Sequence, residues 1–429
     1  MKITPSDSKD SNTGKEVYIF TTGQIMDART AGARRVLNIA RSLAYGNVKV
    51  FIFSFIDFLN LCDEIQEIQK GVYGYCKVNR DSTNYRGSLQ RFLRTSHGYM
   101  RKGRSDTVVY LYPTTFIFKD FIYLLYFKYL KGYRFFCEIN ELRSSIAFSS
   151  RPPDGILRKL IYLVKSVRDY LLYSANEWQV GLYDGVTVIS VALEQYFIRH
   201  ARRSIKIPIL CNSDDMAADS TPKFFDDGVF KLCFSGYVNI DKEGFDILLE
   251  SLSKVNRNRS VELYIYGFLD DKDSVRLKKL ADKYGFASNV FYLGNVDPEK
   301  LQNEFLKYHL LILPRPLNRR TMYGLSTKLS EYLVSNTPVL VTDVSDNALI
   351  IQDNFNGFII PPGSTEAMTE KILEIIKSYN SVAREVVANA HRTVKEKLDY
   401  RLFSNQYIDF FFSNISKKSK EFSVKYQPR

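Results

Sequence analysis

The chain contains two successive series of short β-branched or aromatic runs that alternate with helical patterns. Such alternation is typical of parallel βα units, in which a helix connects neighbouring strands of one sheet. Between the two series, residues 212–228 are dominated by polar, acidic and turn-forming side chains, as expected of a linker. The order of these segments predicts an α/β protein in which two doubly wound parallel sheets form two Rossmann-like domains.

The expected elements follow from the spacing of apolar residues, which recur every three or four positions in helices. In the first series we expect strands at 17–20, 48–54, 107–112, 134–138, 185–189 and 205–210, and helices at 31–44, 118–130, 156–173 and 192–200. In the second series we expect strands at 230–235, 261–266, 290–293, 310–313, 339–342 and 357–360, and helices near 244–255, 273–284, 298–306, 326–335 and 365–378.

The two series set the expected domain boundaries. They divide the chain into a polar tail at 1–15, a first domain at 16–212, a linker at 213–228, a second domain at 229–398 and a basic tail at 417–429. The stretch near 401–413 is too apolar for a free tail, so we expect a helix at about 400–415 that packs back on the first domain. Because open α/β sheets bind ligands at the carboxyl ends of their strands, we expect two crevices that face each other across a cleft. This arrangement suits a transfer between two substrates.

The net charge of +13 indicates anionic partners, such as nucleotide diphosphates, nucleic acid or anionic lipid. Residues 119–168 concentrate this charge, because ten of them are Lys or Arg and four are Asp or Glu. The five cysteines lack the spacing of a disulfide framework or a metal site, which indicates reduced thiols in a cytoplasmic protein. Since no run approaches the roughly 20 apolar residues of a transmembrane helix, we expect a soluble or peripheral protein.

The expected helix at 156–173 is amphipathic. It places Arg158, Lys165 and Arg168 on one face, with apolar residues opposite. Together with the aromatic run at 116–136, this helix is a candidate surface for docking on an anionic membrane, such as the inner face of the cell membrane. The alternative is a solvated basic face over an ordinary core.

The segment from Leu311 to Asp343 is the most informative for function. A buried strand is expected to end at Pro314, and Gly324 leads into a helix whose first turn contains Ser326 and Thr327. Such a turn presents unpaired backbone N–H groups and the positive end of the helix dipole, so it is a candidate site for a diphosphate.

Two charged residues follow in that helix. Lys328 and Glu331 are three positions apart and therefore share a helix face. The Glu331 carboxylate is placed to accept hydrogen bonds from both ribose hydroxyls of a nucleotide. In the alternative interpretation, Ser326 and Thr327 only cap the helix, and Lys328 and Glu331 form an exposed ion pair.

The sequence from Gly324 to Val339, GLSTKLSEYLVSNTPV, resembles a donor-domain segment of the retaining GT-B glycosyltransferases of the family-4 type. That family carries Gly-x-[Pro/Ser]-x-Lys-x-x-Glu-Tyr-[Leu/Met], followed by Pro-Val. The resemblance implies that the second domain binds a UDP- or GDP-sugar and the first binds a sugar or lipid-linked saccharide acceptor. It further implies retaining hexosyl transfer without a metal or other cofactor, as in the synthesis of bacterial surface polysaccharide or glycolipid.

The resemblance extends to the start of the second domain, at Phe234-Ser235-Gly236 and Lys242-Glu243-Gly244. It implies that Gly236 lies at the donor and that Lys242 contacts the diphosphate and stabilises the departing nucleotide. Tyr237 stands where many relatives have an arginine that shares this task. We expect Arg315, Arg319 or Arg320 to substitute for it.

On the acceptor side, the resemblance implies a glycine loop at Gly23 and Gly32 that faces the sugar and the acceptor. Gly32 has a plain alternative as a turn glycine before a helix. Asn140 and Glu141 follow an expected strand where many relatives carry a His-Asp or His-Glu pair. Asn140 replaces the histidine, and Glu141 is the candidate that contacts the acceptor hydroxyl.

The sequence contains no pattern that predicts a metal site. The histidines at 97, 200, 309 and 391 are scattered and lack zinc-ligand spacing. Asp271-Lys272-Asp273 matches the metal-binding Asp-x-Asp of a different glycosyltransferase fold, but acidic residues are also favoured at a helix start, and this segment opens an expected helix.

Two other functions remain open at this stage. The first is a catalytically inactive partner subunit that binds a nucleotide sugar, because Tyr237, Tyr323 and Asn140 depart from the family pattern. Tyr323 occupies the first position of a Glu-x7-Glu pair of which Glu331 matches the second. The other function is nucleic-acid binding, for which the sequence contains no recognition motif.

Overall fold

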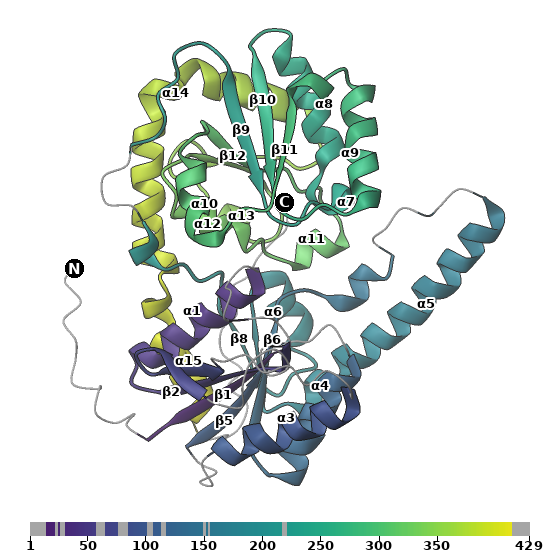
Figure 1. Cartoon of the computed structure of the whole chain (residues 1–429), viewed down its shortest axis with the longest axis vertical. Helices are drawn as coiled ribbons and strands as arrows, with labels where there is room; N and C mark the ends of the chain where they lie inside the picture. The colour runs from purple at the N-terminus through teal and green to yellow at the C-terminus, as the bar shows by residue number, and fades with distance from the viewer. Residues whose placement is uncertain are drawn as a thin grey trace.

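The computed structural model describes residues 14–21, 25, 31–56, 65–75, 85–100, 106–112, 117–148, 152, 155–216 and 221–413. It contains two α/β domains stacked along the long axis of the molecule (Figure 1). The first domain occupies the lower half of that view, and the second domain the upper half.

The first domain is built on an eight-stranded sheet with the order β3-β4-β2-β1-β5-β6-β7-β8. All neighbouring strands are parallel except β3 and β4, which form an antiparallel pair at one edge. The strands are β1 (Glu16–Thr21), β2 (Lys49–Ser54), β3 (Ile65–Gln69), β4 (Val72–Tyr75), β5 (Thr107–Leu111), β6 (Arg134–Ile139), β7 (Gly185–Val188) and β8 (Ser204–Lys206).

Helices cover both faces of this sheet because its central strands are apolar on both sides. In β1, Val17 and Ile19 pack with the core under α1 and α15, whereas Tyr18 and Phe20 pack with the core under α3 and α4. The helices are α1 (Ala31–Tyr45), α3 (Tyr85–Tyr99), α4 (Ile117–Tyr123) with its π-helical continuation Leu124–Leu130, α5 (Ile156–Trp178), α6 (Val191–Phe197) and α15 (Ser404–Phe412).

The second domain has a six-stranded, fully parallel sheet with the order β11-β10-β9-β12-β13-β14. Its strands are β9 (Phe230–Ser235), β10 (Val261–Tyr266), β11 (Val290–Gly294), β12 (Leu310–Leu313), β13 (Val339–Thr342) and β14 (Phe358–Ile360). Its helices are α7 (Ile240–Glu243), α8 (Phe245–Asn256), α9 (Asp271–Lys283), α10 (Pro298–Phe305), α11 (Arg319–Tyr323), α12 (Lys328–Leu333), α13 (Asn347–Ile350) and α14 (Thr365–Thr393).

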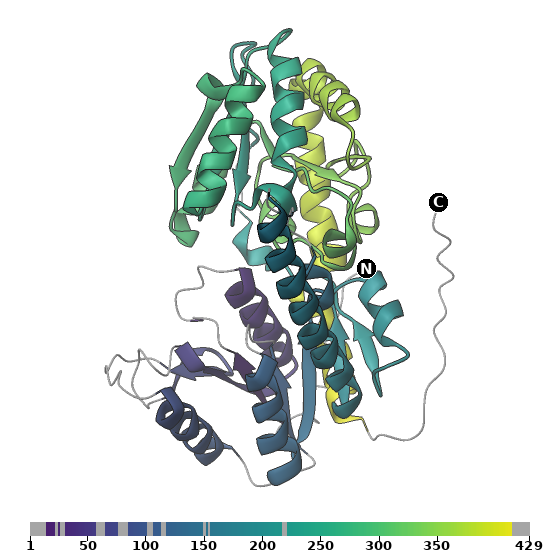
Figure 2. The same cartoon turned by 90° about the vertical axis from the view of Figure 1, so that its right-hand side faces the viewer.

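The chain returns to the first domain at its C-terminal end. Helix α14 runs down the side of the second domain, and α15 then lies beside α1 (Figures 1 and 2). Phe411 of α15 contacts Tyr110 of β5 with ring centroids 5.0 Å apart, so aromatic packing holds α15 on the first sheet.

The prediction of two doubly wound parallel sheets is confirmed, and several element boundaries differ from expectation. The strand expected at 205–210 is only the three-residue β8, and the helix expected at 365–378 continues to Thr393. The helix expected at 118–130 changes to π-helix after Tyr123. The β3–β4 hairpin and α3 were not predicted. Within the described residues, no helix combines the length and apolar character that crossing a bilayer requires.

Candidate functional site

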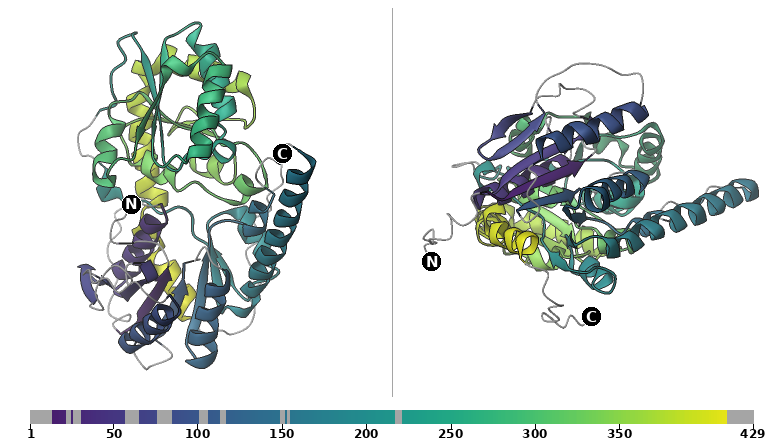
Figure 3. Two further views of the ribbon diagram at one scale, coloured as in Figure 1. Left: turned by 45° about the vertical axis from the view of Figure 1, so that its right-hand side comes forward. Right: turned by 90° about the horizontal axis from the view of Figure 1, so that it is seen from below.

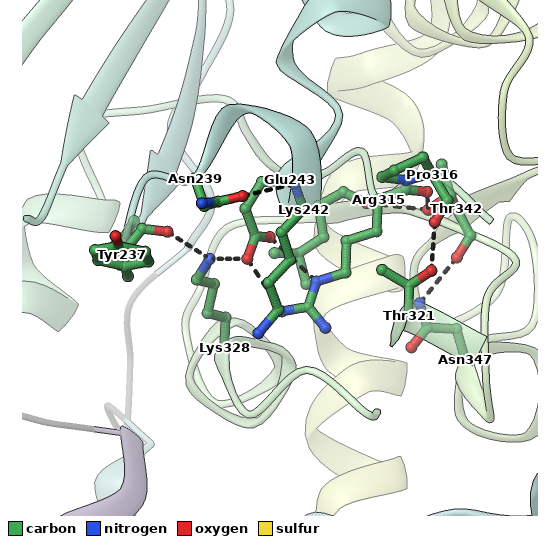
Figure 4. Close-up of polar contacts among 12 residues, drawn as sticks. Tyr237, Asn239, Lys242, Glu243, Arg315, Pro316, Thr321, Lys328, Thr342 and Asn347 are labelled. Atoms are coloured by element: carbon green, nitrogen blue, oxygen red, sulfur yellow. Dashed lines mark hydrogen bonds and ion pairs between the residues drawn. The ribbon is translucent and has the colours of Figure 1, made fainter. Parts of the chain in front are cut away.

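Four charged side chains meet where β9 and β12 of the second domain end (Figure 4). Glu243 is buried at the end of α7 and binds Arg315 through two hydrogen bonds of 3.1 Å each. Lys328 of α12 contacts the same carboxylate at 2.9 Å. Lys242 precedes Glu243 and lies beside Arg315. Two cations therefore pair with one buried carboxylate and a third lies near them, which leaves the cluster with surplus positive charge.

Neighbouring polar groups fix the loops that carry these cations. Asn239 caps α7 by accepting a 2.9 Å hydrogen bond from the Lys242 backbone N–H. The Thr342 hydroxyl donates to the Arg315 carbonyl at 2.7 Å, and the Thr321 hydroxyl donates to the Pro316 carbonyl at 2.5 Å. Side chains on rigidly held loops keep their geometry before a ligand arrives, as electrostatic stabilisation requires.

Two glycines permit the close packing of this cluster. Gly244 adopts φ +72°, and a Cβ there would lie 2.1 Å from the Pro314 carbonyl oxygen. Gly236 adopts φ +128°, and a Cβ there would lie 2.3 Å from Cε of Lys328. Both positions therefore require glycine, for backbone conformation and for space. Gly236 lets the Lys328 side chain pass under the end of β9.

The electrostatics of the cluster follow from its burial. Burial lowers the pKa of Lys328 to about 8, against the opposing effect of Glu243. Burial together with Arg315 and Arg320 lowers the pKa of Lys242 to about 8. Burial alone would raise the pKa of Glu243, but Arg315 and Lys328 hold it well below its usual range. The two lysines would gain free energy from an anionic ligand, whose charge favours their protonated forms.

The short helix α12 differs from the sequence expectation. It begins at Lys328 and has six residues, so its dipole is weaker than that of the expected helix at 326–335. Thr327 makes no side-chain cap at its start, and the buried Ser326 hydroxyl has no hydrogen-bond partner within the described part of the chain. The interpretation that these two residues only cap the helix is therefore wrong. A buried hydroxyl without a partner is suited to a ligand oxygen.

Glu331 also lies at the domain interface. Its carboxylate forms a 2.9 Å ion pair with Arg34 of α1 in the first domain. Burial raises the pKa of Glu331, and Arg34 and Lys328 oppose that rise. The alternative of an exposed Lys328–Glu331 ion pair is wrong, because both side chains are largely buried and pair with other residues.

On the first domain, the residues expected near the acceptor converge at the ends of β5 and β6. The Asn140 amide donates a 2.9 Å hydrogen bond to the Tyr112 hydroxyl, and a Cβ at Gly32 would lie 3.4 Å from that hydroxyl. Gly324 of the second domain faces the same group, because a Cβ there would lie 3.9 Å from Cβ of Glu141. Gly23 lies outside the described residues.

The expected substitutes for the missing arginine occupy different places. The Tyr237 ring is about half exposed and stacks on Phe268, with centroids 5.7 Å apart. Arg315 is held by Glu243 inside the cluster. Arg320 reaches across the interface to Glu141, with 3.9 Å between its Nε and the carboxylate. Arg315 and Arg320 both contribute positive charge at Lys242.

Further contacts across the interface were not predicted. The two carboxylate oxygens of Asp346, after β13, share the Val191 backbone N–H at 3.1 Å each, and Asp346 forms a 3.1 Å ion pair with Lys206. The Ser190 hydroxyl donates to the Tyr323 carbonyl at 2.8 Å. Tyr323, which stands at the first position of the expected acidic pair, also packs its ring against Tyr196. These contacts hold the carboxyl ends of the two sheets against each other.

Four site residues had weak or no sequence signals. Glu243 is the second residue of the Lys-Glu-Gly motif, and Arg34 follows the Gly32 turn, so both stand beside residues that were predicted. Tyr112 follows β5 directly and Asp346 lies in the loop after β13, at the carboxyl ends of strands where open α/β sheets place ligand-binding residues. Among the described residues, no three His, Cys, Asp or Glu side chains converge as a metal site. Asp271 and Asp273 lie in the first turn of α9.

Residues 217–393 match the family model described as "Glycosyl transferases group 1". Over 143 residues, the chain is 28% identical to a sucrose synthase of Melioribacter roseus, covering 32% of this chain and 18% of the relative. Over 171 residues, it is 25% identical to a poly(ribitol-phosphate) alpha-N-acetylglucosaminyltransferase of Staphylococcus aureus, covering 39% and 32%. The chain thus spans less than a third of the length of either curated relative.

Solved structures of the same architecture match nearly the whole chain. A sucrose-phosphate synthase from Thermosynechococcus elongatus aligns with a TM-score of 0.65 at 14% identity, covering 92% of this chain and 97% of the other. Anabaena Alr3699/HepE, solved in complex with UDP and glucose, aligns with a TM-score of 0.63 at 14% identity, covering 93% and 100%. These matches establish that the fold is GT-B.

Proposed function

Because residues 217–393 match the glycosyl transferases group 1 model in a chain of GT-B fold, we propose that this protein is a glycosyltransferase that uses a nucleotide-diphosphate sugar. The observation that carries the proposal is the surplus of cations around Glu243, with Lys242, Arg315 and Lys328 at the carboxyl ends of the second sheet. A diphosphate supplies the missing negative charge at this point.

In the proposed complex, the diphosphate lies against Lys242, Lys328 and the Ser326 hydroxyl. The ribose hydroxyls donate to Glu331, whose carboxylate lies at the domain interface beside Arg34. Side-chain cations then provide the counter-charge for the leaving group, so we propose a metal-independent reaction. Anabaena Alr3699/HepE has been solved with UDP-glucose, which supports a UDP-sugar as the first donor to test here.

The proposed reaction retains the configuration at the anomeric carbon, as the resemblance of the Gly324–Val339 segment implies. The acceptor hydroxyl attacks the anomeric carbon while the bond from that carbon to the diphosphate oxygen breaks. The hydroxyl proton passes to the departing diphosphate on the same face of the sugar. Asn140 and Glu141 lie opposite Gly324 and would orient the acceptor.

A bacterial surface polysaccharide or glycolipid is the acceptor class we propose. Support comes from the S. aureus relative, whose name gives poly(ribitol-phosphate) as its acceptor. We propose a saccharide hydroxyl as the accepting group, because the site residues on the first domain are polar and lie at the interface.

The test combines a thermal-shift panel of UDP- and GDP-sugars with a transfer assay on the same protein. A ligand that binds only the folded state raises the melting temperature. We expect one nucleotide sugar to stabilise the chain and to release its nucleoside diphosphate when a saccharide acceptor is added, with the product anomer identified by NMR. Binding without turnover over the acceptor panel would favour the inactive partner subunit, and the absence of any stabilisation would contradict both functions.

A further inference from the structure

Helix α5 has an unusual orientation of its apolar face. It projects from the first domain along one side of the molecule (Figures 1 and 3). A surface helix of a soluble protein turns its apolar stripe toward the core. In α5 the buried residues are Ser166 and Glu177. Several apolar residues of α5 are exposed instead, with 56–90% of their surface accessible: Ile156, Leu157, Leu160, Ile161, Val164 and Leu171.

Cationic side chains border this apolar face. At 100° per residue, Arg158 and Lys165 follow one margin of the face, Arg168 lies just inside that margin, and Lys159 lies near the other margin. All four are exposed, and Arg168 pairs with the neighbouring Asp169 at 2.7 Å. Long basic side chains at such margins can keep their charge in water while their stems cover apolar surface.

Further exposed apolar side chains lie on α4, which contacts α5, and on its π-helical extension. Phe118 and Leu130 are 73% and 74% exposed there. Next to them, a groove of about 870 Å³ between α3 and α4 is lined by apolar side chains such as Leu93 and Ile122, together with Arg94. Exposed apolar surface of this extent marks an interaction site.

The pattern distinguishes between two classes of partner. The apolar face of α5 covers about half of the helix circumference, wider than the seam of a helix pair. A second copy of this chain would bring the same cations to the contact, where they repel one another. Anionic lipid headgroups attract them, and the interfacial region accepts the apolar face.

We propose that α5 and the exposed part of α4 bind an anionic lipid bilayer, with the apolar face of α5 at the acyl boundary and Arg158, Lys159 and Lys165 at the headgroups. This surface lies outside the donor cluster around Glu243. Binding to a bilayer needs no turnover, so this proposal and the proposed function succeed or fail separately.

The experiment is flotation of the full-length protein with vesicles of phosphatidylcholine alone or mixed with phosphatidylglycerol. We expect wild-type protein to float with the mixed vesicles and at least about tenfold less with the neutral ones. Val164→Glu, at the centre of the face, should lower binding to the mixed vesicles at least about tenfold. Lys165→Ala should lower it about fivefold.

Matched controls are available on α9 of the second domain, where Val275 and Lys278 are also exposed. Val275→Glu and Lys278→Ala should leave flotation unchanged. The proposal is overturned if wild-type protein does not float with phosphatidylglycerol, or if the α9 variants lose as much binding as the α5 variants. It is also overturned if sedimentation shows self-association without vesicles that Val164→Glu abolishes, because the face would then bind a second copy.

Discussion

Glu243 holds the cations of the second domain together, although its position in the sequence gives little indication of that role. Lys242 and Lys328 are predicted from motifs, and Arg315 as one of three candidates to replace the arginine missing at Tyr237. The meeting of these cations around one carboxylate depends on where two loops of the fold meet. The pairing of Glu331 with Arg34 was equally unpredictable, because it joins two domains. Residue types at motif positions can be read from a sequence, whereas ion pairs between distant loops require the packed backbone.

The depressed lysine pKa values lead to a pH dependence of donor binding. Lys242 and Lys328 have a pKa of about 8 in the free protein, and a bound diphosphate favours their charged forms. Affinity is therefore full below pH 8 and declines as pH rises above it. We expect the Kd for UDP, measured by calorimetry, to rise at least about tenfold between about pH 7 and pH 9.5.

The matched variant for this profile is Lys242→Arg, because a guanidinium stays charged over the whole range. The Kd of this variant for UDP should rise less than that of the wild type as the pH increases above 8. A wild-type Kd that does not change over this range would contradict the assignment of these lysines to the diphosphate.

Central strands and long helices were the most predictable elements. Runs such as those of β5 and β9 are largely apolar, which is typical of strands buried on both faces. The β3–β4 hairpin escaped prediction because IQEIQ is polar and VYGY is short. Helix α3 escaped because it contains two glycines and many polar residues. These elements depend on tertiary contacts more than on local propensity.

The tight turn from α7 to α8 allows a prediction about the stability of the protein. Gly244→Ala places a Cβ 2.1 Å from the Pro314 carbonyl at a positive φ, whereas Gly285→Ala has a similar φ of +63° and nothing within 4 Å. Conformational strain alone costs about 1 kcal/mol, which lowers the melting temperature of a domain of this size by about 3 °C. We expect that shift for Gly285→Ala and at least twice that shift for Gly244→Ala in thermal unfolding.

Equal shifts in melting temperature for the two variants would show that the backbone at Pro314 moves aside without a cost in stability. The position of Arg315, which follows Pro314, would then be less fixed than its contacts with Glu243 and Thr342 indicate.

At the scale of the whole molecule, the sequence predicted two domains but not how they meet. The interface is formed by contacts such as Asp346 with Val191 and Lys206, and Arg320 with Glu141. No sequence motif around these residues indicates that they form pairs. They bring the carboxyl ends of both sheets together, so that in the proposed complex a donor on the second domain would face an acceptor on the first.

Asp346→Ala tests whether this interface serves transfer. The change removes the acceptor of the Val191 N–H and the ion-pair partner of Lys206, while the cluster around Glu243 remains intact. We expect the Kd for UDP to stay within about twofold and the transfer rate to fall at least about tenfold, since misplaced reactants lose much of their effective concentration. Asp271→Ala on α9 is the control, and equal transfer rates for the two variants would count against the interface.

The central claim is that the cations around Glu243 bind the diphosphate of a nucleotide sugar. A calorimetric titration of UDP into wild-type protein, Lys242→Ala and the exposed control Lys278→Ala at neutral pH tests it directly. We predict at least about tenfold weaker binding for Lys242→Ala, because a charge-assisted hydrogen bond is lost, and wild-type affinity for Lys278→Ala. Wild-type affinity in Lys242→Ala, at an unchanged melting temperature, would contradict the claim.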